Sequence, residues 1–580
     1  MRTILAVGLL AAALNWPLWP QCPDGTPPPC ARPAGRLPTS RPAAASIAVL
    51  DLRNLSPDTS DTYLAEGLAV ELTSRLGQLG RLIVKARTAV ERLRRAGEMS
   101  AEELGRALDV SYLVGGSIRR SGPRVRVSVH VLRAATGVQV WANQYDREAS
   151  DLLAIQEEVA AAVAEAIVGR LAPTERSALA QRPTGNPVAF DAYLRGSTAM
   201  RAGRTQDALR ALRQAVALDS NYADALALMS RAYSREYWGS IFRHDSLLVL
   251  ARAAADRAVA LAPDRRDTRL ALGYYHYWGF RDYARATEEF ALALRAAPND
   301  PEVLGAIAFV ARRQGRWDAH LTNLERALAL DPADTANVVE LVISLLYLRR
   351  WEDAESWMAR YDPDTSFADF STPRVWSLLA RGRLDEARRL AHRMPRDLRG
   401  LMALSAPREL PTISVFVRID SAARDTILRG SQASLTLAQR GTVPFLRAFA
   451  YQAGGRHAEA RAALDSILPM VEMMARVRGD QGEVRSGLAY IYASLGRSDL
   501  ARREAELAEQ LMPTSTDAMI GPSLELNHAA VLVLVGDHDG AVVKLERLLG
   551  IPAPITRELL RVDPFWDPLR GNVRFQRLVR

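Results

Sequence analysis

One spacing constrains this chain more than any other feature: a skeleton of small, bulky and small residues, closed by proline, recurs every 34 residues. Pro298 and Pro332 stand one such period apart. The residues before them read Ala286, Phe290 and Ala293 in one copy and His320, Leu324 and Ala327 in the next. A period of this length indicates stacked two-helix units, because each unit can bury its apolar face only against its neighbours.

The skeleton continues on both sides of this pair. Small residues let the two helices of a unit approach closely, the bulky residue fills the space between units, and proline ends the second helix. The further copies are Ala208, Leu212 and Ala215 with Gly196 in the first helix, then Ala251, Ala255, Ala258 and Pro263, then Ala354 and Met358, Ala387, Ala460 and Leu464, Ala501, Ala505, Ala508 and Pro513, and finally Ala541, Leu545 and Leu548.

This pattern resembles the tetratricopeptide (TPR) repeat. The resemblance implies an all-α TPR superhelix, an α-solenoid, of about eight or nine units. We expect TPR repeats over residues 187–362 and 441–553, separated by a degenerate, irregular helical region at 363–440. Residues 554–580 resemble the closing segment of many bacterial TPR proteins, so we expect them to cap the last hairpin.

A different pattern precedes the repeats, over residues 46–175. Apolar runs and strict alternation, clearest at Val125, Val127 and Val129, indicate strands. The expected strands are 46–50, 82–84, 112–118, 125–131 and 138–145, and the expected helices are 61–76, 101–108 and 151–168. This order predicts an α/β module, a mixed sheet with packed helices.

Several of these segments resemble the TolB amino-terminal-like domain and the related FlgO-like domains. They are residues 46–55, the helix around Leu64 to Leu68, residues 112–117 and residues 141–147. Asp51-Leu52 departs from the family, which usually shows Pro-Phe there. The resemblance implies an envelope or regulatory interaction module, which in bacteria often precedes TPR repeats. The resemblance implies no catalytic residues at matching positions of this sequence.

The first 45 residues contain the features of an export signal. Arg2 and the apolar run 4–14 are typical of a signal peptide and too short for a comfortable membrane span, so residues 1–21 are predicted to be a signal peptide or an N-terminal anchor. Residues 22–45 form a Pro-rich linker that holds Cys22 and Cys30. In an exported chain these cysteines can form a small disulfide loop; the alternative is two free thiols. The sequence leaves open whether residues 1–21 are cleaved or remain as an anchor.

The charge pattern and the absence of catalytic motifs exclude several classes of function. The net charge is +9, but its arginines alternate with acids, which indicates solvated helix faces rather than a nucleic-acid surface. A P-loop, a kinase set, a nucleophile elbow and a His-Glu-x-x-His motif are absent from the sequence. The sequence therefore predicts a non-catalytic protein without cofactor or metal. His276 fits an aromatic core position better than a ligand contact.

The binding hypothesis comes from the TPR resemblance, in which certain positions of each first helix line a concave groove. Aromatic residues and arginine dominate interface energetics, and Arg312 could hold a peptide carboxylate through a bidentate pair. Each of these side chains could instead pack between hairpins. The predicted groove residues are Tyr193, Tyr275, Trp278, Phe309, Arg312, Phe449 and Tyr490.

Three functions follow from these observations. The first is an exported, periplasmic or cell-envelope scaffold that holds a protein or peptide partner, with membrane association only through the N-terminal segment. The second is a sensory or regulatory module, in which the α/β domain binds a small ligand or partner and the repeats relay it, as in regions that accompany cyclase or kinase domains. The third is an enzyme remnant or accessory to such a domain. The sequence favours the first.

Overall fold

The computed structural model describes most of the chain from Ala45 to the C-terminus, where residues 45–580 form one compact unit. The predicted signal segment and both cysteines lie outside the described residues. Within them, no helix is long and apolar enough to cross a membrane. The described residues are 45–58, 61–77, 79, 81–85, 90, 99–148, 151–180, 183–239, 244–332, 334–361, 368–393, 397–398, 401, 412–433, 435, 437–478 and 481–580.

A mixed sheet near the N-terminus confirms the predicted α/β module in outline. Its strand order is β3-β1-β4-β5-β6, and the short β2 pairs with β4. The pairs β1–β3 and β1–β4 are parallel, whereas β4–β5 and β5–β6 are antiparallel. Sequence patterns did not reveal β2, because two residues show no periodicity. The strands are β1 Ala45–Val49, β2 Arg53–Asn54, β3 Leu82–Lys85, β4 Tyr112–Ser121, β5 Arg124–Arg133 and β6 Gln139–Glu148.

Helices cover both faces of this sheet. Ile47 and Val49 point into the core beneath α1 (Thr62–Gly77) and α4 (Leu152–Val168). Ala48, between them, points to the opposite face and packs near α3 (Ala101–Leu108). Alternating burial along a strand that is covered on both faces follows from the period of two.

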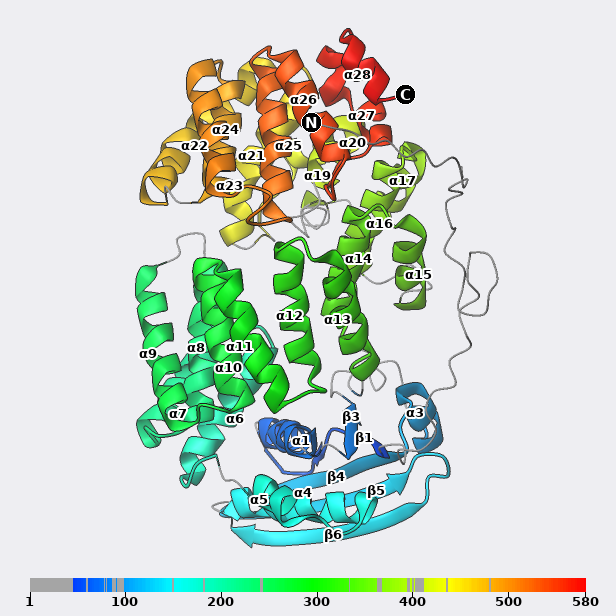
Figure 1. The fold of residues 1–580 in the computed structure, drawn as a ribbon, viewed down its shortest axis with the longest axis vertical. Coiled ribbons are helices and arrows are strands. Elements are labelled where there is room, and N and C mark those ends of the chain that lie inside the picture. Colours follow the sequence, from blue (N-terminus) through cyan, green and yellow to red (C-terminus); the bar gives the residue numbers. More distant parts are fainter. Residues whose placement is uncertain are drawn as a thin grey trace, which may run out of the picture. The chain divides into compact units, whose positions relative to one another are not determined.

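The α/β module and the first repeats share one hydrophobic core. Helix α1 lies between the sheet and α6 (Pro187–Arg201) (Figure 1). Gly67 allows this approach, because a Cβ atom there would come within 2.9 Å of the Leu194 side chain. The Tyr63 hydroxyl donates a hydrogen bond to Asp191, and the Arg195 guanidinium lies 4.7 Å from the Tyr63 ring centroid.

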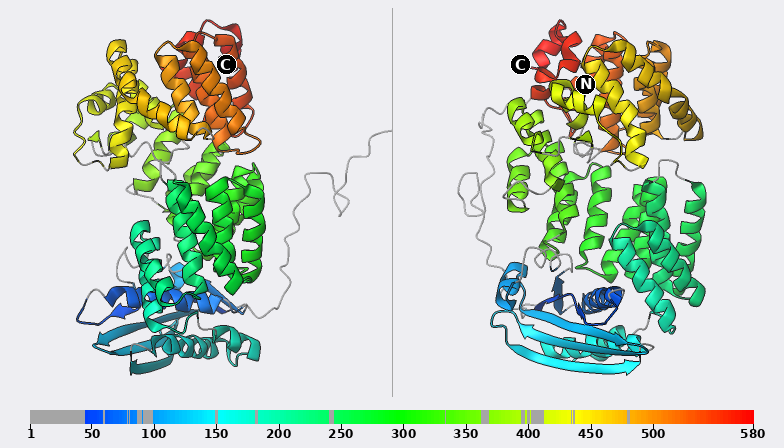
Figure 2. Two further views of the ribbon diagram at one scale, coloured as in Figure 1. Left: turned by 90° about the vertical axis from the view of Figure 1, so that its left-hand side faces the viewer. Right: turned by 180° about the vertical axis from the view of Figure 1, so that it is seen from behind.

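The rest of the described chain consists of packed helices, as the sequence predicted. Consecutive helices pair, α6 with α7, α8 with α9 and α12 with α13 (Figure 1 and Figure 2). We call α6 to α13 the proximal hairpins. Their bounds after α5 (Pro173–Leu179) and α6 are α7 Thr205–Leu218, α8 Ala223–Gly239, α9 Asp245–Leu261, α10 Arg266–Tyr274, the π-helix η3 Tyr275–Phe280, α11 Tyr283–Ala296, α12 Pro301–Arg313 and α13 Trp317–Leu330.

We call residues 335–580 the distal block. Its described helices include four within 363–440, the region that the sequence marked as irregular. Their bounds are α14 Thr335–Tyr347, α15 Trp351–Tyr361, α16 Ala368–Ala380, α17 Leu384–Ala391, α19 Thr412–Ile419, α20 Ser421–Arg429, α21 Leu437–Ala453, α22 His457–Val477, α23 Gly482–Ser494, α24 Ser498–Leu511, α25 Ile520–Leu534, α26 His538–Leu549, α27 Arg557–Val562, the 3-10 helix η4 Pro564–Leu569 and α28 Val573–Leu578.

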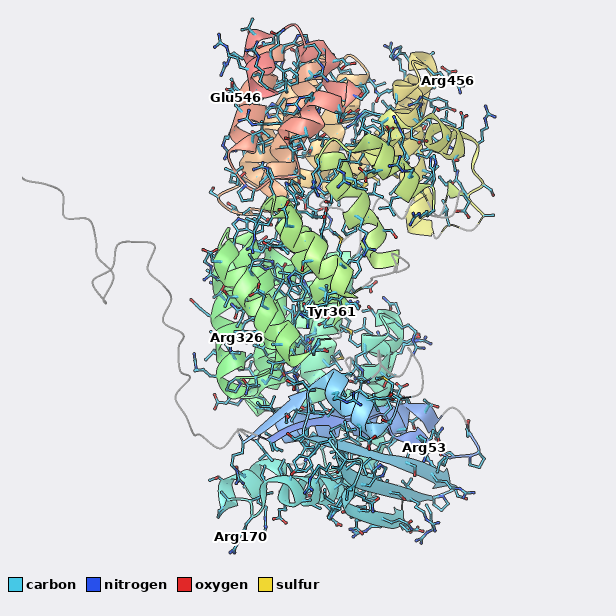
Figure 3. The ribbon with its side chains drawn as sticks, turned by 90° about the vertical axis from the view of Figure 1, so that its right-hand side faces the viewer. Arg53, Arg170, Arg326, Tyr361, Arg456 and Glu546 are labelled. Carbon is cyan, nitrogen blue, oxygen red and sulfur yellow. The ribbon has the colours of Figure 1, made fainter. Side chains whose placement is uncertain are left out.

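The distal block closes on itself, which the repeat pattern did not predict. The Thr556 hydroxyl donates to the Ala380 carbonyl, and Arg349 Nη2 donates to the Ile555 carbonyl at 3.2 Å. One hydrophobic cluster runs from α12 and α13 through α14 and α19 to α28. Charged side chains occur along the whole described chain, as Arg170, Arg326, Arg456 and Glu546 show in Figure 3.

Candidate functional site

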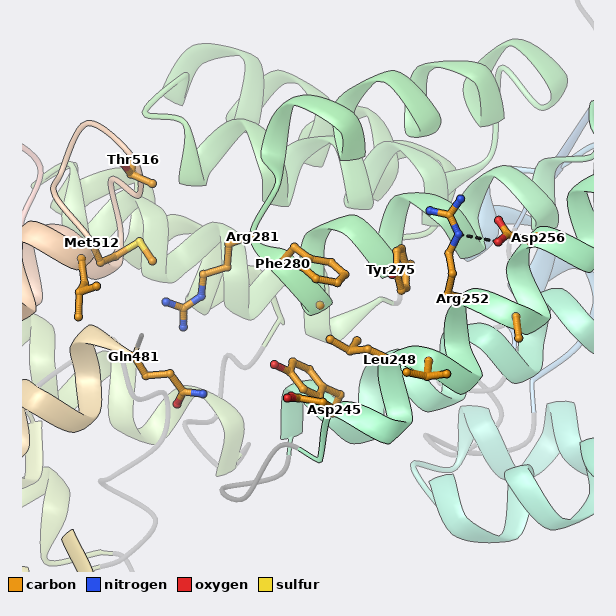
Figure 4. Close-up of a pocket in the computed structure, with 15 residues that line it drawn as sticks. Asp245, Leu248, Arg252, Asp256, Tyr275, Phe280, Arg281, Gln481, Met512 and Thr516 are labelled. Atoms are coloured by element: carbon orange, nitrogen blue, oxygen red, sulfur yellow. Dashed lines mark hydrogen bonds and ion pairs between the residues drawn. The ribbon is translucent and has the colours of Figure 1, made fainter. Parts of the chain in front are cut away.

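An open groove of about 940 Å³ lies where the proximal hairpins face the distal block. Helices α8 and α9 and the π-helix η3 form one wall, and residues 481 and 511–516 contribute the other (Figure 4). We call it the inter-repeat groove. Its lining includes Leu248, Arg252, Tyr275, Phe280, Arg281 and Gln481.

A buried carboxylate fixes the two walls relative to each other. Asp517, fully buried, accepts a hydrogen bond of 2.5 Å from the Tyr283 hydroxyl and lies 3.5 Å from Arg313 Nη1. The backbone N–H of Ala518 donates to the Arg313 carbonyl at 2.7 Å. Burial and the adjacent Asp517 both raise the pKa of Tyr283, so it remains a neutral donor. The groove is therefore held open by contacts between segments more than 200 residues apart.

One hairpin contains an additional residue between its two helices' contact points, and this residue shapes the groove wall. Gly196 meets Leu212 in one hairpin, and Gly273 meets Phe290 in another, each contact so close that a Cβ atom would clash. The first pair is separated by 16 residues and the second by 17. The chain absorbs the extra residue as the single π-turn η3, which ends at Arg281 with a left-handed φ of 54°. π-Turns of this kind frequently occur at functional sites.

The π-turn brings apolar side chains into the groove. Tyr275 is buried, and its ring centroid lies 5.2 Å from that of Phe280 in an edge-on arrangement. Phe280 itself is 56% exposed and lines the groove. Leu248 approaches the backbone of η3 because Gly279 has no Cβ, which would lie 2.9 Å from a Leu248 methyl group.

Ion pairs surround this apolar floor. Arg252 Nε lies 2.7 Å from Asp256 Oδ2 (Figure 4), and Arg281 pairs with Glu483. Burial works to lower the pKa of Arg281, but Glu483 outweighs it and the pKa is raised, so the guanidinium keeps its charge. Because each arginine here has an acidic partner, the rim presents both signs of charge and no single-sign field.

Gln481 adds an unused polar group. Its side chain is 8% exposed, and its Nε2 has no hydrogen-bond partner among the described residues. A buried amide without a partner is costly, so such a group in a native protein calls for an explanation. Gln481 belongs to the groove wall (Figure 4), where Nε2 itself is covered by neighbouring atoms.

The other predicted groove residues lie elsewhere. Tyr193, half-buried on α6, packs 5.1 Å from Tyr222, and burial and the nearby Glu71 hold its pKa well above the usual value. Trp278 stacks on Tyr274 with ring centroids 4.1 Å apart. Phe309 is partly buried between two hydrophobic clusters. These three side chains pack between helices and do not line the inter-repeat groove.

Arg312 has a partner within the chain. It is 3% exposed, and its Nη1 donates to Glu340 Oε2 at 2.6 Å. The structure thus directs this part of the guanidinium toward a carboxylate of α14, rather than toward the surface that the sequence analysis assigned to it. His276 is buried beside Tyr275 in η3, and burial lowers its pKa.

Phe449 and Tyr490 meet in the distal block. Their ring centroids lie 5.0 Å apart, and both side chains line a second, smaller cavity. Of the seven predicted groove residues, therefore, only Tyr275 belongs to the inter-repeat groove. Sequence reasoning missed Phe280, Arg281 and Gln481. The longer interval between Gly273 and Phe290 was the available signal for the first two, whereas Gln481 carried none.

The described residues contain no group of three or more His, Cys, Asp or Glu side chains placed to hold a metal ion. No protein-family model matches the chain. A curated protein named Putative adenylate cyclase 3, from Rhizobium meliloti (strain 1021), is 30% identical over 200 residues. The match covers 34% of this chain and 34% of that protein, so the chain spans about a third of the length of the relative it matches.

A solved structure of Naa15/Naa10 bound to HypK-THB covers 62% of this chain and 68% of that chain, at 12% identity and a TM-score of 0.22. At so low a TM-score the likeness carries no argument about this fold.

Proposed function

We propose that the chain is a non-catalytic scaffold of TPR-type repeats that binds an extended peptide segment of a partner protein in the inter-repeat groove. The observation that carries the proposal is the exposed Phe280 ring in a groove whose wall also holds the buried, unpartnered amide nitrogen of Gln481. Phe280 and Leu248 offer an apolar anchor site, and the amide offers a donor for the peptide backbone. An apolar anchor plus main-chain hydrogen bonds is a common mode of peptide recognition.

The repeat geometry supports the same proposal. The small residues Gly196, Ala208 and Ala286 are buried where paired helices meet, as the TPR skeleton requires. Repeats of this kind present extended binding surfaces because each unit contacts only its neighbours. The resemblance to TolB amino-terminal-like domains and the N-terminal apolar run fit an exported protein of the cell envelope.

A peptide selection tests this function. The full chain is immobilised and challenged with a displayed library of random 12-residue peptides, and the enriched peptides are measured by fluorescence anisotropy. We expect Phe280→Ala combined with Gln481→Ala to weaken binding by at least about tenfold, because both the anchor site and the donor are lost. The matched control is Val573→Ala, at a residue equally exposed but far along the chain. Equal binding by all three proteins would exclude the groove.

The relative named as an adenylate cyclase supports a second candidate, a regulatory module that accompanies a nucleotide cyclase. The similarity covers only a third of that protein. It therefore supports a shared regulatory region rather than a shared catalytic activity. Incubating the purified chain with ATP and Mg²⁺ and quantifying cyclic AMP tests whether the chain itself is catalytic. Cyclic AMP above a heat-denatured control would contradict the non-catalytic scaffold.

Export is tested separately. Residues 1–45 are fused to alkaline phosphatase, an enzyme that is active only after export in bacteria. We expect activity in the fusion and none after Leu9→Arg and Leu10→Arg, because the two charges interrupt the apolar run. An inactive unmodified fusion would contradict the exported location without affecting the groove.

A further inference from the structure

A second cavity, of about 230 Å³, lies inside the distal block and takes no part in the inter-repeat groove. It forms where α19, from the region marked as irregular, meets α21, α23, α25, α27 and η4. We call it the distal cavity. Its lining includes Val415, Phe449, Tyr490, Leu526, Ile555 and Trp566.

An ion pair forms part of the cavity wall. Arg418 of α19 donates through Nε to Asp563 Oδ1 at 2.7 Å and through Nη2 to Asp563 Oδ2. Asp563 is 1% exposed and also accepts from the backbone N–H of Phe565 at 3.1 Å. The Arg418 guanidinium lies 5.2 Å from the Phe565 ring centroid. A buried, bidentate pair of this kind fixes the orientation of both side chains.

The pair makes the wall electrically neutral but leaves a donor. Arg418 uses Nε and Nη2 on Asp563, and its Nη1 has no hydrogen-bond partner in the described part of the chain. A ligand with a net charge would lose its hydration here without meeting an opposite net charge. A neutral acceptor, such as a carbonyl oxygen, can take the remaining N–H at little electrostatic cost.

The rest of the lining is largely aromatic and aliphatic. Phe449 and Tyr490 line it from α21 and α23, and Trp566, whose ring centroid lies 4.9 Å from that of Phe565, lines it from η4. Leu526 and Ile555 add apolar surface. Aromatic walls favour a flat ring, which gains stacked or edge-on contacts beyond its buried area.

We propose that the distal cavity binds a small neutral aromatic compound whose carbonyl oxygen accepts a hydrogen bond from Arg418. At about 230 Å³ the cavity is smaller than the pockets of about 300–1,000 Å³ that hold drug-sized ligands, so it suits a small compound. Compounds of the size of an aromatic amide fit this limit. The site would give the scaffold a small-molecule ligand in addition to its peptide, and its existence does not depend on the peptide groove.

Benzamide is a suitable probe, and benzoate is its charged counterpart of nearly the same shape. Both are titrated into the full chain by isothermal calorimetry. We expect benzamide to bind, and benzoate to bind at least about tenfold more weakly, because Asp563 already neutralises Arg418. Equal or tighter binding of benzoate would contradict the proposed neutral site, and no binding of benzamide would contradict the cavity as a ligand site.

A filled cavity provides the structural test. Ala530 lines the cavity, whereas Ala462 lies exposed on α22 in the same block. We expect Ala530→Phe to reduce benzamide affinity at least about tenfold and Ala462→Phe to leave it within about twofold. Unchanged affinity in Ala530→Phe would overturn the location.

Photolabelling of the unmodified chain keeps the proposal testable if Ala530→Phe does not fold. The chain is irradiated with 4-azidobenzamide, and the labelled peptides are mapped by mass spectrometry. We expect label in peptides that contain Phe449, Tyr490 or Trp566, reduced by excess benzamide. Label confined to other peptides would overturn the proposal, and so would label that benzamide does not displace.

Discussion

The proximal hairpins and the distal block are built from the same kind of helix pair, yet they bury their surfaces in different ways. In the proximal hairpins, α6 packs on α7 and α8 packs on α9, so most contacts join neighbours in sequence. In the distal block, α16 and α19 pack against α27 and η4, and Thr556 reaches Ala380, 176 residues earlier. The proximal hairpins form most of the lining of a groove of about 940 Å³, and the distal block alone lines a smaller cavity of about 230 Å³ that is also open to the surface.

This difference shows that two kinds of contact determine the fold. Small residues at fixed spacing determine how each hairpin pairs, because they set the distance between helices. Buried polar contacts between distant segments determine how hairpins are placed against one another. Asp517 between the two regions and Asp563 within the distal block are the main examples.

The largest effect is expected where the two regions meet. Asp517→Ala leaves Arg313 buried beside an unfilled position and removes the acceptor of the Tyr283 hydroxyl. We expect the free energy of unfolding to fall by about 3–5 kcal/mol, measured by urea denaturation with circular dichroism. The control is Asp385→Ala, in a pair that is 80% exposed on its acidic side, with a change below about 0.5 kcal/mol. Similar changes in both variants would show that Asp517 does not join the regions.

The next effect tests closure of the distal block. Asp563→Ala leaves Arg418 without its carboxylate partner, and we expect a loss of about 3 kcal/mol in the same assay. Combining Arg418→Met with Asp563→Leu removes both charges, so the double variant should lose less than Asp563→Ala alone. A double variant that loses more than the single one would mean that the apolar surroundings, rather than the lone charge, determine the cost.

A pair of glycine substitutions tests the hairpin spacing. Gly273→Ala places a Cβ atom 2.2 Å from the Phe290 ring, so we expect a loss of about 1–3 kcal/mol from overpacking. Gly487 also lies in a helix, but a Cβ atom there meets nothing within 4 Å. Gly487→Ala should therefore stabilise the chain by about 0.5–1 kcal/mol. Equal signs for the two substitutions, read from thermal unfolding, would contradict the close-packing argument.

A further effect is a change of stability with pH where α1 meets the first hairpins. Burial raises the pKa of Glu71 to about 7, Arg75 and Arg265 oppose this rise, and Asp224 and Asp267 add to it. Because the folded pKa exceeds the unfolded value, the folded chain holds the proton and its stability decreases as the pH rises through 7. We expect a decrease of about 1 kcal/mol between pH 6 and pH 8.

Glu71→Gln provides the control for this pH dependence. The amide keeps the shape of the protonated carboxyl group but does not titrate. We expect the stability of this variant to vary less between pH 6 and pH 8 than that of the unmodified chain. An identical dependence in both proteins would assign the effect to another group.

The sequence was sufficient for the parts of the fold that depend on neighbours. The mixed sheet, the alternation at Val125 and Val127, and the packed helices that follow the α/β module are local patterns, and the structure confirms them. The closure of the distal block was not predictable in this way. It depends on which arginine meets which acid across more than 100 residues, and nothing in the spacing of Arg418 or Asp563 identifies the partner.

The structure places the predicted groove residues at several different positions. Tyr275 was chosen because aromatic residues dominate interfaces, and it lines the groove. Trp278 and Arg312 were chosen on the same ground, but they make contacts inside the chain. The direction of a side chain depends on the helix phase, and the π-turn changes that phase at Tyr275. A single additional residue before Ala286 therefore altered which side chains reach the groove.

Hydrogen exchange of the full chain, with and without a selected peptide, tests the central claim most directly. The account predicts slower exchange on peptide binding in α9, in residues 275–281 and at the start of α23, because these segments form the inter-repeat groove. Exchange in α26 and α28 should stay unchanged. Protection confined to the C-terminal helices, or none in residues 275–281, would contradict the groove as the peptide site.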